Sequence, residues 1–454
     1  MPLSDSLLND PVTASIPAAE AALTLEAMRL GVVPSTRVEA YTVGRDEEMA
    51  AIAADLGRVE ADGGAVRVFL GDYGTGKTHL LEIAQLSALA RGHLCARVVL
   101  DPSETSPSQP KRVFRAAMRS LRYPDRSESS GLGLRPLLQQ AIDNDEALAA
   151  FDVKPAKGRS TEQRLEQGYH LYLSPALSYF KTLSRPLSRP PRKVDEAQRE
   201  SWLEQQSNLL FEWLEGHPTV SNQLIDEELH KLPGHHPKIY SLLDYRPWSR
   251  IYGYLLSGIA RLARAVGYQG LTVLLDEAEF YALLSPQNRA FARFLFKAWS
   301  AAAIGGEVEK LSLDEEGREV GGYGIQRELP VQYHPRSGLY LILAMTPTAD
   351  GLAALEGAIP PDAISSLVRL EPIDYVNLVR RVFEFYASAR PDWVLPAALL
   401  TPLTEVVRGL LQTGVLANPR HAMKFIIDFI DVVHYYPDRV LELIRGLQQT
   451  LVGS

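Results

Sequence analysis

A glycine-rich octapeptide, residues 71 to 78, has the residue types and the spacing that bind a nucleoside triphosphate. It reads Gly-Asp-Tyr-Gly-Thr-Gly-Lys-Thr, and such a P-loop turns backbone N–H groups and the positive end of the following helix toward phosphates. The apolar run Val66 to Leu70 predicts a strand before the loop, and Thr78 to Ala90 predicts the helix after it. We therefore expect an ATP site. Its contacts are expected from Gly71, Asp72, Tyr73, Gly74, Thr75, Gly76, Lys77, Thr78 and His79.

A pair of carboxylates follows a second apolar run. Residues 271 to 275 read Leu-Thr-Val-Leu-Leu and precede Asp276 and Glu277. Continuous apolar runs mark strands that are buried on both faces, and ligands bind at the carboxyl ends of such strands. We expect Lys77 to reach the β- and γ-phosphates, and Thr78 together with Asp276 to hold Mg²⁺. Glu277 is placed to polarise the attacking water, which predicts ATP hydrolysis by this Walker-B pair.

Three weaker signals are similar to motifs of AAA+ ATPases. Thr346 follows the apolar run 339–345, where a sensor-one side chain orients water near the γ-phosphate. Arg420 follows Asn418-Pro419 at the start of an expected helix, where a sensor-two arginine folds back onto the γ-phosphate. The order of these signals along the chain predicts an AAA+ core followed by a helical lid. The adenine side of the site is expected at Val43, Gly44 and Arg45.

The arginine that a neighbouring subunit would contribute to hydrolysis is harder to locate. The usual position, just before the last core strand, holds no arginine. Each remaining candidate has an equally good interpretation as a packing or surface residue. The candidates are Arg369, inside an expected strand 367–370, and Arg289 and Arg293, on an expected helix 287–303. Two polar residues after the acidic pair, Glu279 and Tyr281, also fit a position facing the active site, but packing or exposure to solvent is the preferred interpretation.

The composition limits the class of protein. The chain has 454 residues, a formal net charge of −8 and 46% hydrophobic residues, which suits a globular α/β protein of two or three domains. Because the chain is acidic, any contact with DNA must come from a local basic patch. The single cysteine, Cys95, excludes a disulfide within the chain and a cysteine-based zinc site. Since no charged leader precedes Arg29 and no run of about 18 apolar residues occurs, we expect a cytoplasmic protein without membrane contact.

The spacing of the motifs predicts the domain organisation. A minimal P-loop core places roughly 50 residues between its lysine and its Walker-B aspartate, and the stretch from Lys77 to Asp276 is several times longer. The excess has helical patterns, so it predicts a helical insertion. We expect an N-terminal helical segment (1–40), an α/β ATPase core (41–104 and 271–373), a mostly helical insertion (105–270) and a C-terminal helical lid of about four helices (374–454).

Several phrases of the sequence resemble one family. Gly31-Val-Val-Pro34, the P-loop octapeptide, and Gly267-Tyr-Gln-Gly270 leading into Leu-Leu-Asp-Glu-Ala-Glu279 resemble the P-loop proteins of BREX-type phage-defence loci. Within them the chain is similar to the shorter BrxD-like ATP-binding proteins, from about Ala19 to the lid. That family resembles the origin-recognition and initiator branch of AAA+. The resemblance implies an ATP-dependent switch on DNA that works with a helicase or another defence protein and assembles with itself when ATP binds.

One departure concerns DNA. Initiator-type proteins carry a winged helix after the lid, and none is expected here, so DNA contact must come from elsewhere. Basic residues at helical spacing form one candidate stripe, opposite Phe114, Met118 and Leu121. A solvated helix face explains the same pattern. The stripe consists of Lys111, Arg112, Arg115, Arg119 and Arg122. A second basic cluster consists of Arg185, Arg189, Arg192 and Lys193. An expected hairpin at 305–337 is a third candidate, but its acidic turn argues against phosphate contact at the tip.

Two other functions fit the same motifs. The chain fits a signalling NTPase whose lid and insertion bind a protein partner without DNA. It also fits a scaffold that binds ATP tightly and hydrolyses it negligibly. Stimulation of turnover by DNA, stimulation by a protein alone, or the absence of turnover distinguishes the three hypotheses.

Overall fold

The computed structural model describes most of the chain. The described residues are 16–34, 37–61, 63–127, 131–153, 161–185, 187, 191, 193–233, 237–240, 242, 249–304, 333, 336–392 and 399–452. Most of the expected hairpin at 305–337, together with Arg189 and Arg192, lies outside these residues. The chain forms two compact units. One comprises residues 1–51, 71–84 and 366–454, and the other comprises residues 52–70 and 85–365.

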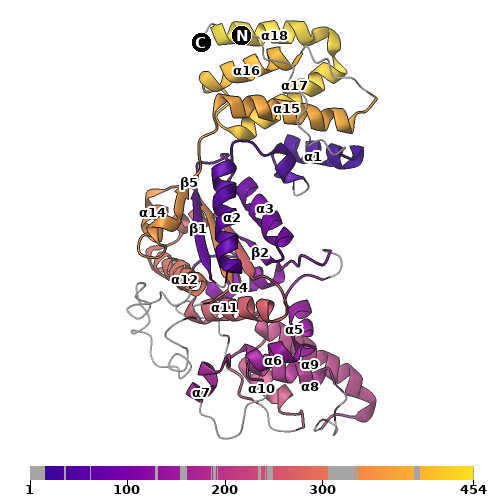
Figure 1. Cartoon of the computed structure of the whole chain (residues 1–454), viewed down its shortest axis with the longest axis vertical. Helices are drawn as coiled ribbons and strands as arrows, with labels where there is room; N and C mark the ends of the chain where they lie inside the picture. The colour runs from indigo at the N-terminus through magenta and orange to yellow at the C-terminus, as the bar shows by residue number, and fades with distance from the viewer. Residues whose placement is uncertain are drawn as a thin grey trace. The chain divides into compact units, whose positions relative to one another are not determined.

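A five-stranded sheet forms the centre of the second unit (Figure 1). Its strands are β1 (Ala65–Leu70), β2 (Leu94–Val99), β3 (Leu271–Asp276), β4 (Leu339–Met345) and β5 (Ile364–Ser366). They lie in the order β2-β3-β4-β1-β5, and the pairs β2–β3, β3–β4 and β4–β1 are parallel. Because parallel strands run the same way, Leu70, Asp276 and Met345 end at one edge of the sheet. The fold is therefore an α/β fold, as predicted.

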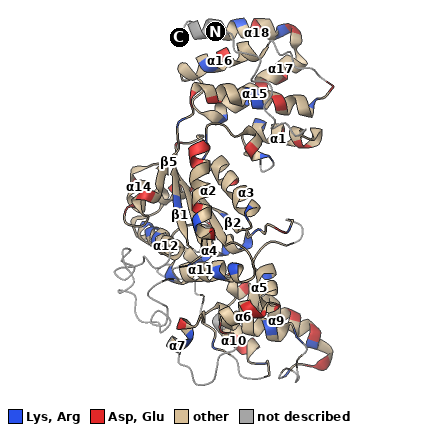
Figure 2. Ribbon diagram, in the orientation of Figure 1, with Lys and Arg blue, Asp and Glu red and all other residues tan. Residues whose placement is uncertain are grey.

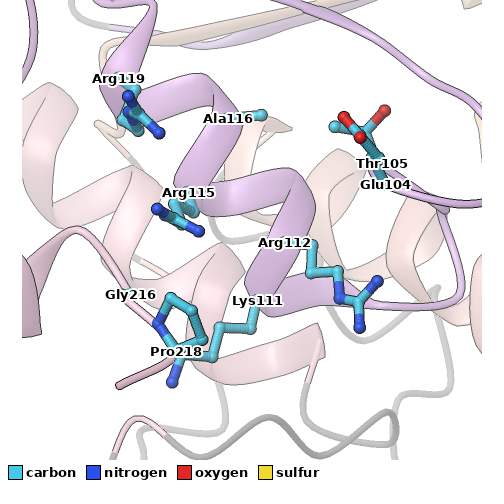
Figure 3. Close-up of a pocket in the computed structure, with 9 residues that line it drawn as sticks. All are labelled: Glu104, Thr105, Lys111, Arg112, Arg115, Ala116, Arg119, Gly216 and Pro218. Carbon is cyan, nitrogen blue, oxygen red and sulfur yellow. The ribbon is translucent and has the colours of Figure 1, made fainter. Parts of the chain in front are cut away.

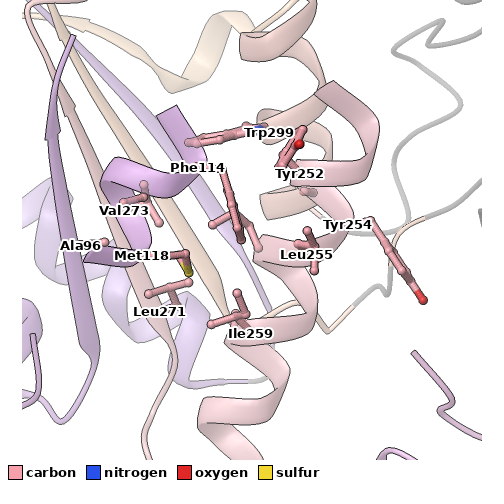
Figure 4. Close-up of a cluster of buried hydrophobic side chains, with 14 of the residues drawn as sticks. Ala96, Phe114, Met118, Tyr252, Tyr254, Leu255, Ile259, Leu271, Val273 and Trp299 are labelled. Carbon is pink, nitrogen blue, oxygen red and sulfur yellow. The ribbon is translucent and has the colours of Figure 1, made fainter. Parts of the chain in front are cut away.

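One face of the sheet packs against three long helices. These are α4 (Pro110–Arg119), α11 (Ser249–Ala265) and α12 (Pro286–Ile304). Side chains on a strand alternate between faces, and every second residue of β1, Val66, Val68 and Leu70, belongs to the same hydrophobic core as these helices. Figure 4 shows Phe114 and Met118 of α4 between the strands and α11. This packing fixes the rotation of α4 about its own axis.

The opposite face of the sheet is anchored to α2 (Asp46–Glu60) by a buried carboxylate. Asp55 is fully buried and accepts hydrogen bonds from Arg67 Nε at 2.8 Å and from the Tyr340 hydroxyl at 2.8 Å. Arg58 adds a third donor at 2.6 Å. A buried charge is tolerated only when it is paired and hydrogen-bonded. These contacts therefore hold α2 on β1 and β4.

Helices fill the rest of this unit between β2 and β3. They pack around a core of aromatic residues that includes the buried Tyr172 and Trp213. The described part of this segment is mostly helical. Its helices before α11 are α5 (Arg135–Ile142), α6 (Asp145–Ala150), α7 (Thr161–Glu166), α8 (Leu173–Leu183), α9 (Arg199–Leu214) and α10 (Asn222–Leu229), and α14 (Ala349–Leu355) follows β4.

The other unit contains the P-loop and the helices at both ends of the chain. After β5 the described residues hold four α-helices: α15 (Pro372–Ala389), α16 (Leu400–Gln412), α17 (Pro419–Tyr435) and α18 (Val440–Val452). Helix α1 (Ala18–Leu30) packs on α15 and α17. Arg29 contacts Asp431 at 2.8 Å, and the Tyr386 hydroxyl donates to the same carboxylate at 2.9 Å. The short helix η2 (Val38–Tyr41) precedes α2, and α3 (Lys77–Ala90) follows the P-loop.

Two expected elements differ from the structure. The strand expected at 367–370 was misplaced, because β5 ends at Ser366 and Arg369 lies beyond it in an extended segment. Side chains there occupy the backbone groups that a strand would use: Glu48 accepts from Val368 N–H at 2.9 Å, and Arg45 donates to the Val368 carbonyl. The sequence pattern of residues 43 to 57 also predicts a helix that starts at residue 43, but α2 begins at Asp46, because Gly44 has a positive φ of 59°.

We predict that Asp55→Ala destabilises the protein strongly. The substitution leaves Arg67, whose side chain is 13% exposed, without its carboxylate, so the free energy of unfolding should fall by about 3 kcal/mol. Tyr340→Phe removes one hydrogen bond and should cost only about 1 kcal/mol. Urea unfolding measures both values. Equal and small losses in the two variants would show that the carboxylate does not anchor α2.

Candidate nucleotide-binding site

The P-loop has the backbone that phosphate binding requires. Gly74 and Gly76 have φ values of 80° and 102°, in the region that side chains disfavour. Helix α3 begins at Lys77, so its N-terminal N–H groups point into the loop. The Lys77 ammonium donates to the carbonyl of Gly71 at 3.0 Å and of Asp72 at 3.4 Å, and the side chain is largely buried. The loop therefore holds its lysine inside the ring of backbone groups.

The buried side chain of Arg45 hydrogen-bonds to the backbone of this loop. Arg45 Nη2 donates to the Thr75 carbonyl at 2.7 Å, and Nη1 donates to Glu48 at 3.1 Å and to the Val368 carbonyl. Arg45 and Glu48 are each only 4% exposed. The guanidinium has five donors in a fixed fork, so it joins the P-loop, α2 and the segment after β5. The expected adenine contact of Arg45 remains a prediction, and so do those of Val43 and Gly44.

The sensor-two candidate contacts the P-loop through an aromatic side chain. Arg420 Nη1 donates to the Tyr73 hydroxyl at 2.7 Å, and its guanidinium carbon lies 4.9 Å from the centre of the Tyr73 ring. Asn418 caps α17 by accepting from His421 N–H at 3.1 Å. A Cβ atom at Gly74 would lie 2.6 Å from the Asn418 side chain. The start of α17 therefore lies directly against the P-loop.

The acidic pair lies at the carboxyl end of β3. Asp276 is 2% exposed; one oxygen accepts from Glu277 N–H at 3.0 Å, and the other lies 3.2 Å from Arg97 Nη2. Glu277 has a φ of 58°, which is rare for a residue with a side chain. Such strained backbone persists where surrounding structure fixes it and is concentrated at functional sites. Sequence reasoning missed Arg97, although the alternation along β2 could have placed it near the end of β3.

The sensor-one candidate pairs with a residue that we expected to pack or face solvent. Thr346 follows β4, and its hydroxyl donates to Glu279. Because β4 lies between β1 and β3, Thr346 leaves the sheet between the strand that precedes the P-loop and the strand that ends in Asp276. Glu279 thus belongs to this edge, and its position two residues after Glu277 was the available signal.

The arginine-finger candidates have different surroundings. Arg289 makes a 2.9 Å ion pair with Asp350 and donates to the Leu284 carbonyl at 3.0 Å. Arg293 donates to the Glu356 carbonyl at 2.7 Å. Both therefore tie α12 to neighbouring segments of its own chain. Arg369 is exposed.

The predicted DNA-contacting stripe is only partly one face. Lys111, Arg112, Arg115 and Arg119 lie on α4. Arg122 does not, because its backbone pairs with Cys95 of β2: Cys95 N–H donates to it at 3.1 Å, and Arg122 N–H donates back at 2.8 Å. This bridge replaces a helical turn, so the prediction that Arg122 continues the stripe was wrong.

No helix in the described part of the chain is long and apolar enough to cross a membrane.

His79 lies half-buried in the first unit, on the first turn of α3. Its Nε2 is 2.8 Å from the Thr42 hydroxyl, and its ring centre is 5.1 Å from that of Tyr41. The Thr42 hydroxyl donates to the Val38 carbonyl at 2.7 Å, so His79 Nε2 is the donor to Thr42. Burial, aided by the charge of Arg45, lowers the pKa of His79 to about 4.

We predict that His79 makes the protein acid-sensitive. Folded His79 stays neutral until about pH 4, whereas an unfolded histidine gains its proton near pH 6.5. Protons therefore favour the unfolded chain, and stability present above pH 6.5 is lost as the pH falls toward 4. His79→Gln should reduce this loss in the thermal midpoint, and the same change at the exposed His421 should not. Identical pH profiles for wild type and His79→Gln would contradict the prediction.

We also predict that Arg45→Lys weakens nucleotide binding. A lysine keeps the charge but cannot donate in a fork to three acceptors, so the P-loop loses the support at Thr75. The Kd for ATP should rise about tenfold, equivalent to about 1.4 kcal/mol, in a calorimetric titration. Arg37→Lys is the control, because Arg37 makes an exposed ion pair with Glu20. The same Kd in both variants would show that Arg45 does not shape the loop.

Comparison with known proteins agrees with these observations. A family model described as BREX system ATP-binding protein BrxC/D matches residues 16–312, which include the P-loop and the Asp276–Glu277 pair. No curated protein matches the chain. Since the match covers more than half of the sequence, the chain belongs to the family of BREX system ATP-binding proteins BrxC/D.

Proposed function

We propose that the protein binds ATP with Mg²⁺ and hydrolyses it as an AAA+ switch in BREX-type antiviral defence. The observation that carries this proposal is the parallel sheet, in which β1 runs directly into the P-loop and β3 ends in the buried Asp276. An α/β sheet places its ligand at the carboxyl ends of its strands. Membership of an ATP-binding family supports the choice of nucleotide.

The residues present fit the two ligands. The inward-held ammonium of Lys77 suits the β- and γ-phosphates, and the N-terminus of α3 favours negative charge. Thr78 is the second residue of α3, next to Lys77. Thr78 and Asp276 would hold Mg²⁺, which supplies neutralisation of the charge that develops on the phosphates. Binding requires Asp276 to exchange part of its contact with Arg97.

Three residues are proposed to orient and deprotonate the water that attacks the γ-phosphate. Glu277 would accept its proton, since the left-handed backbone turns this residue out of the line of β3. Thr346 would orient the water, and Glu279, which accepts the Thr346 hydrogen bond, would position that hydroxyl. A base and a positioned hydroxyl oxygen at adjacent strand ends fit in-line phosphoryl transfer to water.

The contact between Arg420 and Tyr73 suits a switch. Arg420 is held by a phenol rather than by a carboxylate, and a γ-phosphate accepts from a guanidinium more strongly than a neutral hydroxyl does. ATP would therefore draw Arg420 from Tyr73 and shift α15 to α18, which act as the lid. We propose that this change controls assembly into a homo-oligomer, with the exposed Arg369 as the preferred arginine finger over Arg289 and Arg293.

We propose that the switch acts on DNA in the cytoplasm, with a helicase or another protein of the defence system as its partner. The local basic face of α4 supports a DNA contact in a chain of net charge −8. Partner proteins are expected of a system with several components. If turnover ignores DNA and responds to a protein alone, the signalling NTPase becomes the better description.

We predict distinct effects for two substitutions at the nucleotide site. Lys77→Ala should abolish ATP binding, because the loop loses the charge that faces the phosphates. Glu277→Gln should keep ATP binding and slow hydrolysis by at least about 100-fold, because only the proton acceptor is lost. Binding is measured by calorimetry and turnover by phosphate release, with and without DNA and with EDTA to remove Mg²⁺.

The wild type and an Arg37→Lys variant serve as controls for this experiment. Tight ATP binding without turnover in the wild type, with or without DNA, would leave the scaffold hypothesis in place of an ATPase. Turnover that persists in Lys77→Ala would show contamination or a different site.

A further inference from the structure

Helix α4 separates apolar and basic residues between two sides. Phe114 and Met118 are fully buried against α11 and the sheet (Figure 4). The other side carries four cations, and the helix contains no acidic residue, so its ribbon in Figure 2 is blue and tan without red. Because the apolar side is fixed by packing, the cations cannot turn away. They are Lys111, Arg112, Arg115 and Arg119.

These cations line a pocket of about 410 Å³ (Figure 3). One wall is the end of α9, where Gly216 has a φ of 79° and a Cβ atom would lie 3.4 Å from the Lys111 side chain. The other wall is the loop after β2. In Figure 3, Arg115 and Arg119 leave the same side of α4. The remaining lining residues are Glu104, Thr105, Ala116 and Pro218.

The pocket keeps a surplus of positive charge. Of the four lining cations, Arg112 and Arg119 are exposed and Arg115 is half-buried, whereas Lys111 is buried; the one lining carboxylate, Glu104, is exposed to solvent. Glu215, next to the lining residue Gly216, adds a second carboxylate; it accepts from Leu134 N–H at 3.3 Å, and burial raises its pKa despite the charges of Arg119 and Arg115. In the described part of the chain, neither Arg115 nor Arg119 has an ion pair within 4.0 Å. A site of this kind attracts anions.

The shape and chemistry of the pocket favour a phosphate backbone. Lys111 and Arg119 are eight positions apart, a span of about 12 Å along a helix, and phosphates along one DNA strand recur about every 3.4 Å of the axis. The pocket has no aromatic residue on which a base could stack. We propose that the α4 pocket binds the phosphodiester backbone of DNA without reading its sequence. This inference deepens the proposed function, since it gives the DNA association a site.

A short path of hydrogen bonds joins the pocket to the Walker-B strand. Leu100 N–H donates to the Asp276 carbonyl at 3.0 Å, and the Thr105 hydroxyl donates to the Val99 carbonyl at 2.6 Å. Between them, Asp101 accepts from Ser103 N–H and Thr105 N–H at 2.7 and 3.0 Å, which makes the loop compact. The Arg112 guanidinium donates to the Ser103 carbonyl at 3.0 Å. DNA phosphates that bind Arg112 would compete with its hydrogen bond to Ser103 and so shift the loop next to Asp276. DNA binding should therefore change ATP turnover.

The test measures DNA binding without ATP. Fluorescence anisotropy of a labelled oligonucleotide, single-stranded and as duplex, is followed between about 50 and 200 mM salt. The variant is Arg115→Gln with Arg119→Gln, and its control is Arg408→Gln with Arg445→Gln, which removes the same charge from exposed positions of α16 and α18. We expect the pocket variant to bind at least tenfold more weakly and its salt slope to fall by about 2. The control should bind like the wild type.

Failure of this inference is distinct from failure of the proposed ATPase. Equal binding by the pocket variant and the wild type, or no binding by the wild type at low salt, overturns the DNA site even if ATP is hydrolysed. Equal weakening in both double variants also overturns it, because a diffuse field would then explain binding. DNA binding that persists in Lys77→Ala keeps the site even if turnover is absent. Thermal midpoints within a few degrees of the wild type show that each variant folds.

Discussion

A parallel sheet presents every carboxyl end at one edge, and the order of its strands decides which side chains meet there. Here β4 separates β1 from β3, so Thr346, which follows β4, reaches Glu279 in the segment after β3. The hydrophobic effect maintains that order, because the core residues of β1, β3 and β4 pack on α11 and α12. The chemistry at the edge depends on packing well away from it. A change that shifts one strand by a residue would turn its side chains to the wrong face.

The P-loop also depends on an electrostatic interaction, the pairing of the buried Arg45 guanidinium with its acceptors. A guanidinium as deeply buried as that of Arg45 is costly unless acceptors surround it, and the three acceptors come from the P-loop, α2 and the segment after β5. If any one of these acceptors is removed, the guanidinium stays buried with an unsatisfied donor, which destabilises the fold. The conformation of the P-loop is therefore linked to the start of the C-terminal helices through one side chain. This arrangement gives a physical reason why a change in the P-loop would reach α15.

Much of this could be predicted from sequence where a pattern has only one physical reading. The P-loop, the apolar strands at 339–345 and 271–275, and the four C-terminal helices are local patterns, and the structure contains them. The failures concern contacts between distant residues. Nothing local shows that Glu48 and Arg45 bind the backbone of Val368, which is why a strand was expected there. In the same way, spacing alone placed Arg122 on a helix that ends at Arg119, because the backbone bridge to Cys95 has no local signature.

That bridge has a practical consequence. In the sheet order β2 comes first, and unpaired edges of sheets invite association with other chains. Arg122 occupies part of that edge, and the thiol of Cys95, the only cysteine in the sequence, is completely covered. A thiol reagent can therefore modify the native protein only when this edge opens. The rate of labelling would therefore report local opening of the sheet beside β3, without an engineered cysteine.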